Sequence, residues 1–125
     1  MKENKVEKQR YEVIGTLNNN GVVAKDELNK EVILLGKGIG FKRKAGDVIE
    51  NPGKNIKCYS LEKNTGKNVL QGVDPIFLEI ANEIIRYAEK EFGDIDTKIL
   101  LPLADHIAFS IDPVSYTHLT LPTNS

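Results

Sequence analysis

Three consecutive asparagines followed by a glycine, Asn18 to Gly21, interrupt two stretches of strand-like sequence. Before this break, residues 11–17 alternate as in a strand, although both faces of the expected strand carry apolar side chains. Asparagine and glycine tolerate positive φ, so the break is typical of a hairpin turn that leads into residues 22–24. The pattern therefore predicts antiparallel strands.

A second turn, at residues 25–29, precedes a strand expected at residues 31–35, and a fourth short strand is expected at residues 56–61. Together these segments predict a small four-stranded antiparallel meander. A single sheet of this size cannot cover its own apolar face, and domains this short are marginally stable alone. We therefore expect the domain to dimerise face to face.

The second half of the sequence changes to helical spacing. Residues 62–73 are polar and contain glycine, which is typical of a linker. A helix is expected between the N-cap Asp74 and Gly93, and a second from about residue 97 to residue 111, where Pro102 either introduces a kink or marks the first turn. The predicted class is α+β, a dimerising β domain followed by a truncated α-helical domain.

Charge divides the chain in the same way. Residues 1–57 hold 12 Lys and Arg against 8 Asp and Glu, whereas the remainder holds 5 against 10. Because phosphate neutralisation supplies most non-specific affinity for nucleic acid, only the basic half is expected to face a polyanion. The single cysteine, Cys58, cannot form an internal disulfide or a cysteine metal cluster. No apolar run approaches the roughly 20 residues that cross a bilayer, so we expect a cytoplasmic chain without membrane insertion.

Residues 36–44 follow the third strand and contain four cations with no acidic residue. Glycines let a ligand approach the backbone, the cations can contact phosphates, and Phe41 offers a face for stacking an unpaired base. A nucleotide-phosphate loop is not supported, because neither glycine motif of such loops occurs and no helix follows. From the residues alone, a glycine-rich turn with a solvated basic face is an equally good interpretation.

The asparagine turn allows the same two interpretations, because asparagine amides read base edges and are also good turn residues. In a three-strand meander, the first turn and the loop after the third strand lie at one end of the sheet. We therefore expect amides, cations and an aromatic ring to converge on one surface. His106, beside Asp105, is a candidate of another kind, because an exposed imidazole can accept a phosphoryl group, although a lone histidine on a helix usually serves packing or lies at the surface.

At these positions the sequence resembles the BglG/SacY family of transcriptional antiterminators. The family's N-terminal co-antiterminator (CAT) RNA-binding domain typically has Asn-Asn-Asn at a strand end, then Gly-(Lys/Arg)-Gly-(Ile/Leu)-(Gly/Ala)-Phe with trailing Lys and Gly-Asp. The matching segments here are Asn18-Asn19-Asn20, Gly36-Lys37-Gly38-Ile39-Gly40-Phe41 and Lys42-Arg43-Lys44-Ala45-Gly46-Asp47. In the family a regulatory domain controlled by the sugar phosphotransferase system (PTS) follows, and its motifs are matched by Glu83-Ile84-Ile85-Arg86-Tyr87-Ala88 and Asp105-His106-Ile107.

The resemblance implies a domain plan of four segments: a CAT RNA-binding domain at 1–61, a linker at 62–73, the truncated start of a PTS regulation domain (PRD) at 74–113, and residues 114–125. That last segment resembles the in-frame translation of a transposase sequencing adapter, so neither it nor His118 is expected to have a function; an ordinary polar tail is the alternative. The implied RNA contacts are Asn18, Asn20, Gly36, Lys37, Gly38 and Phe41. His106 matches the first phosphorylatable histidine of the PRD.

The function implied by the resemblance is transcription antitermination in a sugar-utilisation operon. A homodimer binds a leader-RNA hairpin, the ribonucleic antiterminator, and prevents the terminator from forming. A PTS phosphocarrier or a sugar-specific EII component phosphorylates His106. We expect no catalytic residue, metal or cofactor. Two alternatives stay open: a module that binds an anion or sugar phosphate without nucleic-acid contact, and a non-functional gene fragment whose helical part frays.

Overall fold

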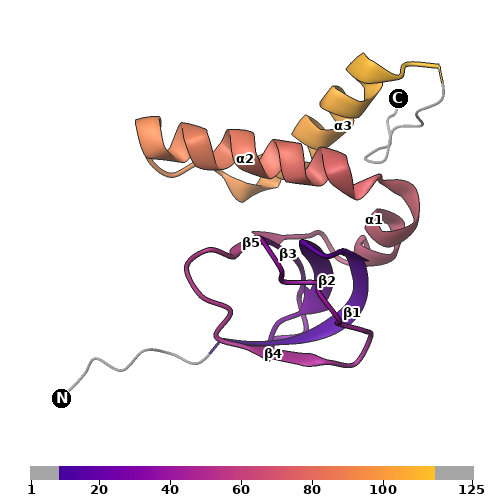
Figure 1. The fold of residues 1–125 in the computed structure, drawn as a ribbon, viewed down its shortest axis with the longest axis vertical. Helices are drawn as coiled ribbons and strands as arrows, with labels where there is room; N and C mark the ends of the chain where they lie inside the picture. Colours follow the sequence, from indigo (N-terminus) through magenta and orange to yellow (C-terminus); the bar gives the residue numbers. More distant parts are fainter. Residues whose placement is uncertain (1–8, 115–125) are drawn as a thin grey trace.

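A computed structural model describes residues 9–114, in which a five-stranded antiparallel sheet carries helices on one side (Figure 1). The strands are β1 (Arg10–Asn18), β2 (Gly21–Lys25), β3 (Glu31–Leu35), β4 (Val48–Glu50) and β5 (Lys57–Ser60). The helices are α1 (Gly66–Gly72), α2 (Pro75–Phe92) and α3 (Leu100–Ile111), and a 3-10 turn, Thr97–Ile99, precedes α3. The predicted α+β class is confirmed.

The strand order is β4-β1-β2-β3-β5, so the sheet has five strands and not the predicted four. The strand that the sequence pattern missed is β4, which pairs with β1 so that Tyr11 lies opposite Ile49. Only Ile49 of its three residues is buried. A segment this short shows no periodicity, and its conformation depends on the pairing with β1.

The hairpin between β1 and β2 is confirmed, but its local cause differs from the expected one. Asn18 pairs with Gly21, which leaves a two-residue turn, and none of residues 18–21 has a positive φ. Instead, the Asn18 side-chain oxygen accepts a hydrogen bond of 2.8 Å from the Asn20 N–H. Such a bond from an asparagine side chain to the backbone two residues later closes an Asx turn, so the asparagine is needed for its amide.

Alternate residues of the central strands enter two separate apolar clusters. The helix-side cluster joins the sheet to all three helices and consists of Val23, Ile33, Leu35, Tyr59, Val69, Val73, Leu78, Ala81, Ile85, Leu100 and Ala104. The opposite cluster lies on the other face and consists of Tyr11, Val13, Val22, Ala24, Val32, Leu34, Ile39 and Ile49. Both faces are thus covered within one chain, so the uncovered face from which we expected a dimer does not exist in this arrangement. Homodimerisation itself stays a prediction.

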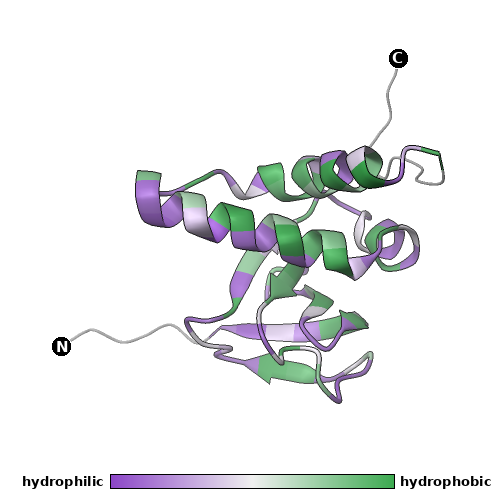
Figure 2. Cartoon of the chain, turned by 45° about the horizontal axis from the view of Figure 1, so that its top comes forward, coloured by the Kyte–Doolittle hydropathy of each residue, from purple (hydrophilic) through white to green (hydrophobic). Residues whose placement is uncertain are grey.

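Local end signals position the helices. The Asp74 side chain accepts a hydrogen bond of 3.1 Å from the Ile76 N–H, and α2 ends at Gly93, as predicted. Pro102 falls in the first turn of α3 and introduces no break. The segment 62–73 is not an irregular linker, because α1 forms within it and buries Val69 completely. Apolar and polar bands alternate along α2, which matches a helix buried on one side (Figure 2).

No helix among residues 9–114 is both long enough and apolar enough to cross a membrane. Residues 115–125, which include His118 and most of the segment attributed to an adapter, lie outside the described residues.

Candidate nucleic-acid interface

The asparagine turn (residues 18–21) and the basic loop (residues 36–44) lie together at one end of the sheet, as the meander predicted. Three N–H groups of the basic loop donate to the turn: Gly36 to the Asn20 carbonyl oxygen (3.0 Å), Gly38 to the Asn20 side-chain oxygen (2.9 Å) and Gly40 to the Asn19 carbonyl oxygen (2.8 Å). These bonds fix the position of one loop against the other. Within the part of the chain that the structure describes, the two candidate segments therefore form one surface.

Two glycines of the basic loop are needed for different reasons. A Cβ atom at Gly36 would lie 2.5 Å from the carbonyl oxygen of Asn55, which leaves no room for a side chain. Gly38 has a φ of 80°, and a Cβ atom there would meet nothing within 4 Å. Its requirement is conformational, because L side chains rarely adopt that backbone.

The side chains of the basic loop are available at the surface. Lys37, Lys42 and Lys44 are exposed, and the ring of Phe41 is 57% exposed. The Lys42 ammonium lies 5.4 Å from the centroid of that ring, within the range of a cation–π contact. Strand β1 holds the loop backbone in place, because the Thr16 hydroxyl donates to the Arg43 carbonyl oxygen over 3.1 Å. A flexible cation and an aromatic face therefore project from a fixed backbone.

These positions lie within a segment that matches a known family. The family model described as "CAT RNA binding domain" matches residues 11–68. This part of the chain belongs to that family. The CAT domain includes both candidate loops and all five strands but ends before α2.

Similar proteins agree with this assignment. The chain is 35% identical over 101 residues to a beta-glucoside operon antiterminator of Dickeya chrysanthemi, covering 77% of this chain and 35% of that protein. It is 30% identical over 100 residues to transcription antiterminator LicT of Bacillus subtilis, covering 76% of this chain and 36% of LicT. It is 35% identical over 106 residues to protein GlcT of Staphylococcus aureus, covering 80% of this chain and 37% of GlcT. The chain thus spans little more than a third of the length of these relatives.

A solved structure, "Crystal structure of GlcT CAT-PRDI", matches with a TM-score of 0.64 and 36% sequence identity. The match covers 82% of this chain and 63% of that chain. This coverage extends beyond the CAT domain, so part of the chain after residue 68 also has a counterpart in that structure.

The side-chain amides of Asn18 and Asn20 have a hydrogen-bond partner that the sequence did not reveal. The side-chain nitrogens of Asn18 and Asn20 donate to the two carboxylate oxygens of Glu79 on α2, over 2.5 Å and 3.2 Å. Helical spacing predicts only that Glu79 lies on the polar face of α2. Its separation of about 60 residues from the turn leaves no local signal for the contact.

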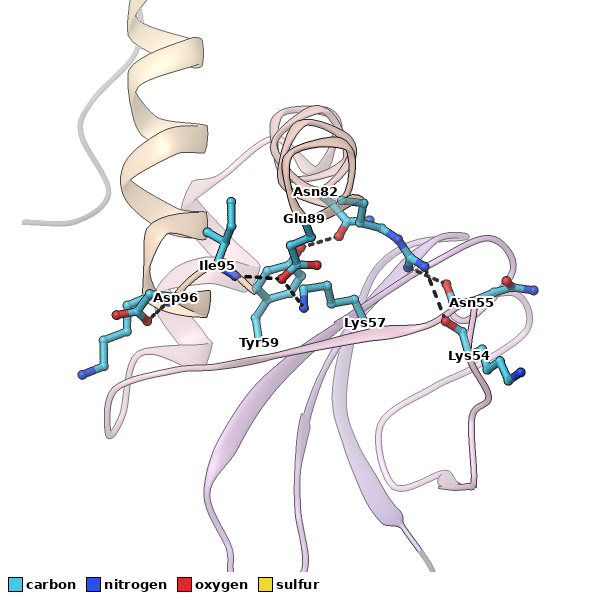
Figure 3. Close-up of polar contacts among 10 residues, drawn as sticks. Lys54, Asn55, Lys57, Tyr59, Asn82, Glu89, Ile95 and Asp96 are labelled. Carbon is cyan, nitrogen blue, oxygen red and sulfur yellow. Dashed lines mark hydrogen bonds and ion pairs between the residues drawn. The ribbon is translucent and has the colours of Figure 1, made fainter. Parts of the chain in front are cut away.

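Further polar contacts hold α2 on the sheet of the CAT domain (Figure 3). The Tyr59 hydroxyl of β5 donates to the Asn82 side-chain oxygen, and both side chains are buried. Burial raises the pKa of the Tyr59 hydroxyl well above its ordinary value, and the nearby Glu89 carboxylate raises it further. The Lys57 ammonium lies 3.2 Å from Glu89, and both side chains are about four-fifths buried. The Arg86 guanidinium donates to two backbone carbonyl oxygens of the loop before β5.

His106 lies on α3 and is exposed, whereas the neighbouring Asp105 is 7% exposed. The structure places His106 on a helix that packs against α2, and not in the surface formed by the two loops. The phosphorylation candidate and the RNA-binding candidates therefore belong to different parts of the molecule.

Proposed function

We propose that this chain acts as a transcription antiterminator, in which the CAT domain binds a leader-RNA hairpin and so prevents an overlapping terminator hairpin from forming in a sugar-utilisation operon. The observation that carries the proposal is the hydrogen-bonded junction of the asparagine turn and the basic loop. The names of the relatives support the same role. The role belongs to the cytoplasm, where transcripts are made, and requires no catalytic step by this chain.

Each candidate residue has a distinct task in this proposal. Lys37 contacts phosphates, and Phe41 stacks on a base that a bulge leaves unpaired. The amides of Asn18 and Asn20 donate to base or phosphate acceptors, since their oxygens already hold the loops in place. Gly36 lets the loop pack against Asn55, and Gly38 supplies a positive φ and leaves open space through which RNA approaches the backbone.

The proposal is tested by titrating the chain into a fluorescently labelled RNA hairpin with an internal bulge. Affinity should fall with salt by about 0.7–0.9 log units per phosphate contacted for each log unit of salt. Phe41→Ala should weaken binding about 5- to 150-fold, the range for loss of one stacked base. Phe92→Ala removes an aromatic ring that is 84% exposed at the end of α2 and serves as the matched control. Equal affinities for the two variants would refute the assigned surface.

We also propose that the CAT domain binds RNA as a homodimer and that a PTS phosphocarrier or a sugar-specific EII component regulates it through the PRD. The exposed imidazole of His106 supports phosphoryl transfer, which adds about −1.5 to −2 charges at the surface of α3. Incubation with a phosphorylated carrier protein should label the wild-type chain and leave His106→Ala unlabelled. Labelling of both chains, or of neither, would contradict the regulatory part. Sedimentation with and without RNA tests the dimer.

A further inference from the structure

We infer that helix α2 competes with RNA for the asparagine turn, so that this arrangement is an autoinhibited state of the CAT domain. The inference rests on the proposed function, because it concerns the same amides. Its basis is the pair of hydrogen bonds from Asn18 and Asn20 to the Glu79 carboxylate.

Each amide group of the two asparagines is already engaged in a hydrogen bond in this state. The Asn18 oxygen accepts from the Asn20 N–H, and the Asn20 oxygen accepts from the Gly38 N–H. Both oxygens therefore maintain the shape of the interface, which leaves the NH₂ groups as the side-chain donors for a ligand. In the structure both of these NH₂ groups point to the carboxylate of Glu79.

A carboxylate oxygen and a phosphate oxygen are equivalent acceptors for an amide N–H, since both are anionic. Glu79 thus occupies the place that an RNA acceptor would take. A phosphate that approached the same amides would also lie within a few ångströms of the Glu79 charge in a half-buried site. Like charges at that separation repel strongly where water is partly excluded, so Glu79 and RNA exclude each other.

Contacts along the same face hold α2 in place, so a rotation of the Glu79 side chain alone would leave the helix beside the amides. Asn82 bonds to Tyr59, Arg86 to the loop before β5, and Glu89 to Lys57. These residues follow Glu79 at intervals of three or four and therefore share one face. Release of the amides then requires movement of α2, which would also expose the helix-side cluster on the sheet, the type of face that we expected a second copy to cover.

Four whole chains, titrated with the bulged hairpin used above, test the inference: wild type, Glu79→Gln, Glu83→Gln and Asn82→Ala. Glu79→Gln should bind about tenfold more tightly than wild type, because a neutral amide is a weaker competitor for the amides than a carboxylate. Glu83→Gln makes the same charge change at an exposed position on α2 and should gain much less. Asn82→Ala changes no charge but loosens α2, and it should also bind more tightly.

Hydrogen exchange of wild type provides a readout that affinity alone does not. Saturation with the hairpin should lower the protection of amides in α2 (Pro75–Phe92) while the β2 and β3 amides stay protected. Unchanged or increased protection of α2 would overturn the inference, as would equal affinities of Glu79→Gln and Glu83→Gln. If wild type and all variants fail to bind the hairpin, the proposed function fails; if they bind and only these comparisons fail, the proposed function stands without autoinhibition.

Discussion

The buried hydrogen bond between Tyr59 and Asn82 gives the sharpest test of how α2 is attached to the sheet. Tyr59 is fully buried and Asn82 is 8% exposed. Tyr59→Phe leaves the Asn82 oxygen without this donor, and Asn82→Ala leaves the hydroxyl without its acceptor, so each should lower the free energy of unfolding by about 1–3 kcal/mol. In the double variant both polar groups are absent. Its loss should therefore be smaller than the sum of the single losses by about 1–2 kcal/mol.

Urea unfolding followed by circular dichroism measures the four free energies of unfolding in this cycle. Tyr87→Phe and Asn68→Ala make the same chemical changes at exposed helical positions and should stay within about 0.5 kcal/mol of wild type. Distant, independent sites are additive within about 0.3–0.5 kcal/mol. A Tyr59–Asn82 coupling inside that range would show that the two groups do not share a hydrogen bond and that α2 is not anchored in this way.

Three further predictions concern the CAT domain and its contact with α2. Gly36→Ala should lower the free energy of unfolding by about 2–4 kcal/mol, from overpacking plus one lost hydrogen bond, as measured by urea unfolding. Burial, with a smaller contribution from Cys58, raises the pKa of Tyr11 from 10.0 to about 12. The raised pKa stabilises the fold by about 2–3 kcal/mol below pH 10, and this stabilisation should disappear as the pH rises through 12. The free energy of unfolding of Tyr11→Phe, measured in urea over the same pH range, should not show this decrease. Lys57→Met breaks the largely buried 3.2 Å ion pair with Glu89 and should cost about 3 kcal/mol, with little difference between low and high salt, again by urea unfolding.

The parts of the fold that the sequence predicted correctly are those with local causes. Asp74 and Gly93 mark the ends of α2 through their own backbone and side-chain preferences, so the helix is readable from its residues. The strand β4 and helix α1 were missed because their stability comes from elsewhere in the chain. β4 forms on β1, and α1 forms around Val69, which the helix-side cluster buries.

The same distinction applies to the candidate interface. The meandering strands place the asparagine turn beside the basic loop, so that the convergence of the two could be predicted from strand order alone. The hydrogen bonds that join the two loops could not be predicted in this way, because the backbone oxygen and the side-chain oxygen of Asn20 accept from two different glycines. Glu79 was missed for a further reason. It meets Asn18 only after α2 has docked, and helical periodicity does not report where a polar face will lie.

The charge asymmetry of the sequence gains a second meaning from this contact, and it leads to a last prediction. The acidic half does not simply avoid the polyanion; it places the Glu79 carboxylate on the basic half.

RNA binding weakens with salt through counterion release, whereas α2 docking depends on apolar packing and half-buried contacts that salt screens little. Competition by α2 should therefore shift the plot of log affinity against log salt without changing its slope. Removal of an ordinary surface charge raises affinity only where screening is weak. Consequently, the lines for wild type and Glu79→Gln should run parallel, whereas those for wild type and Glu83→Gln should converge at high salt. Convergence of both pairs would show that Glu79 acts only as a surface charge and does not compete with RNA.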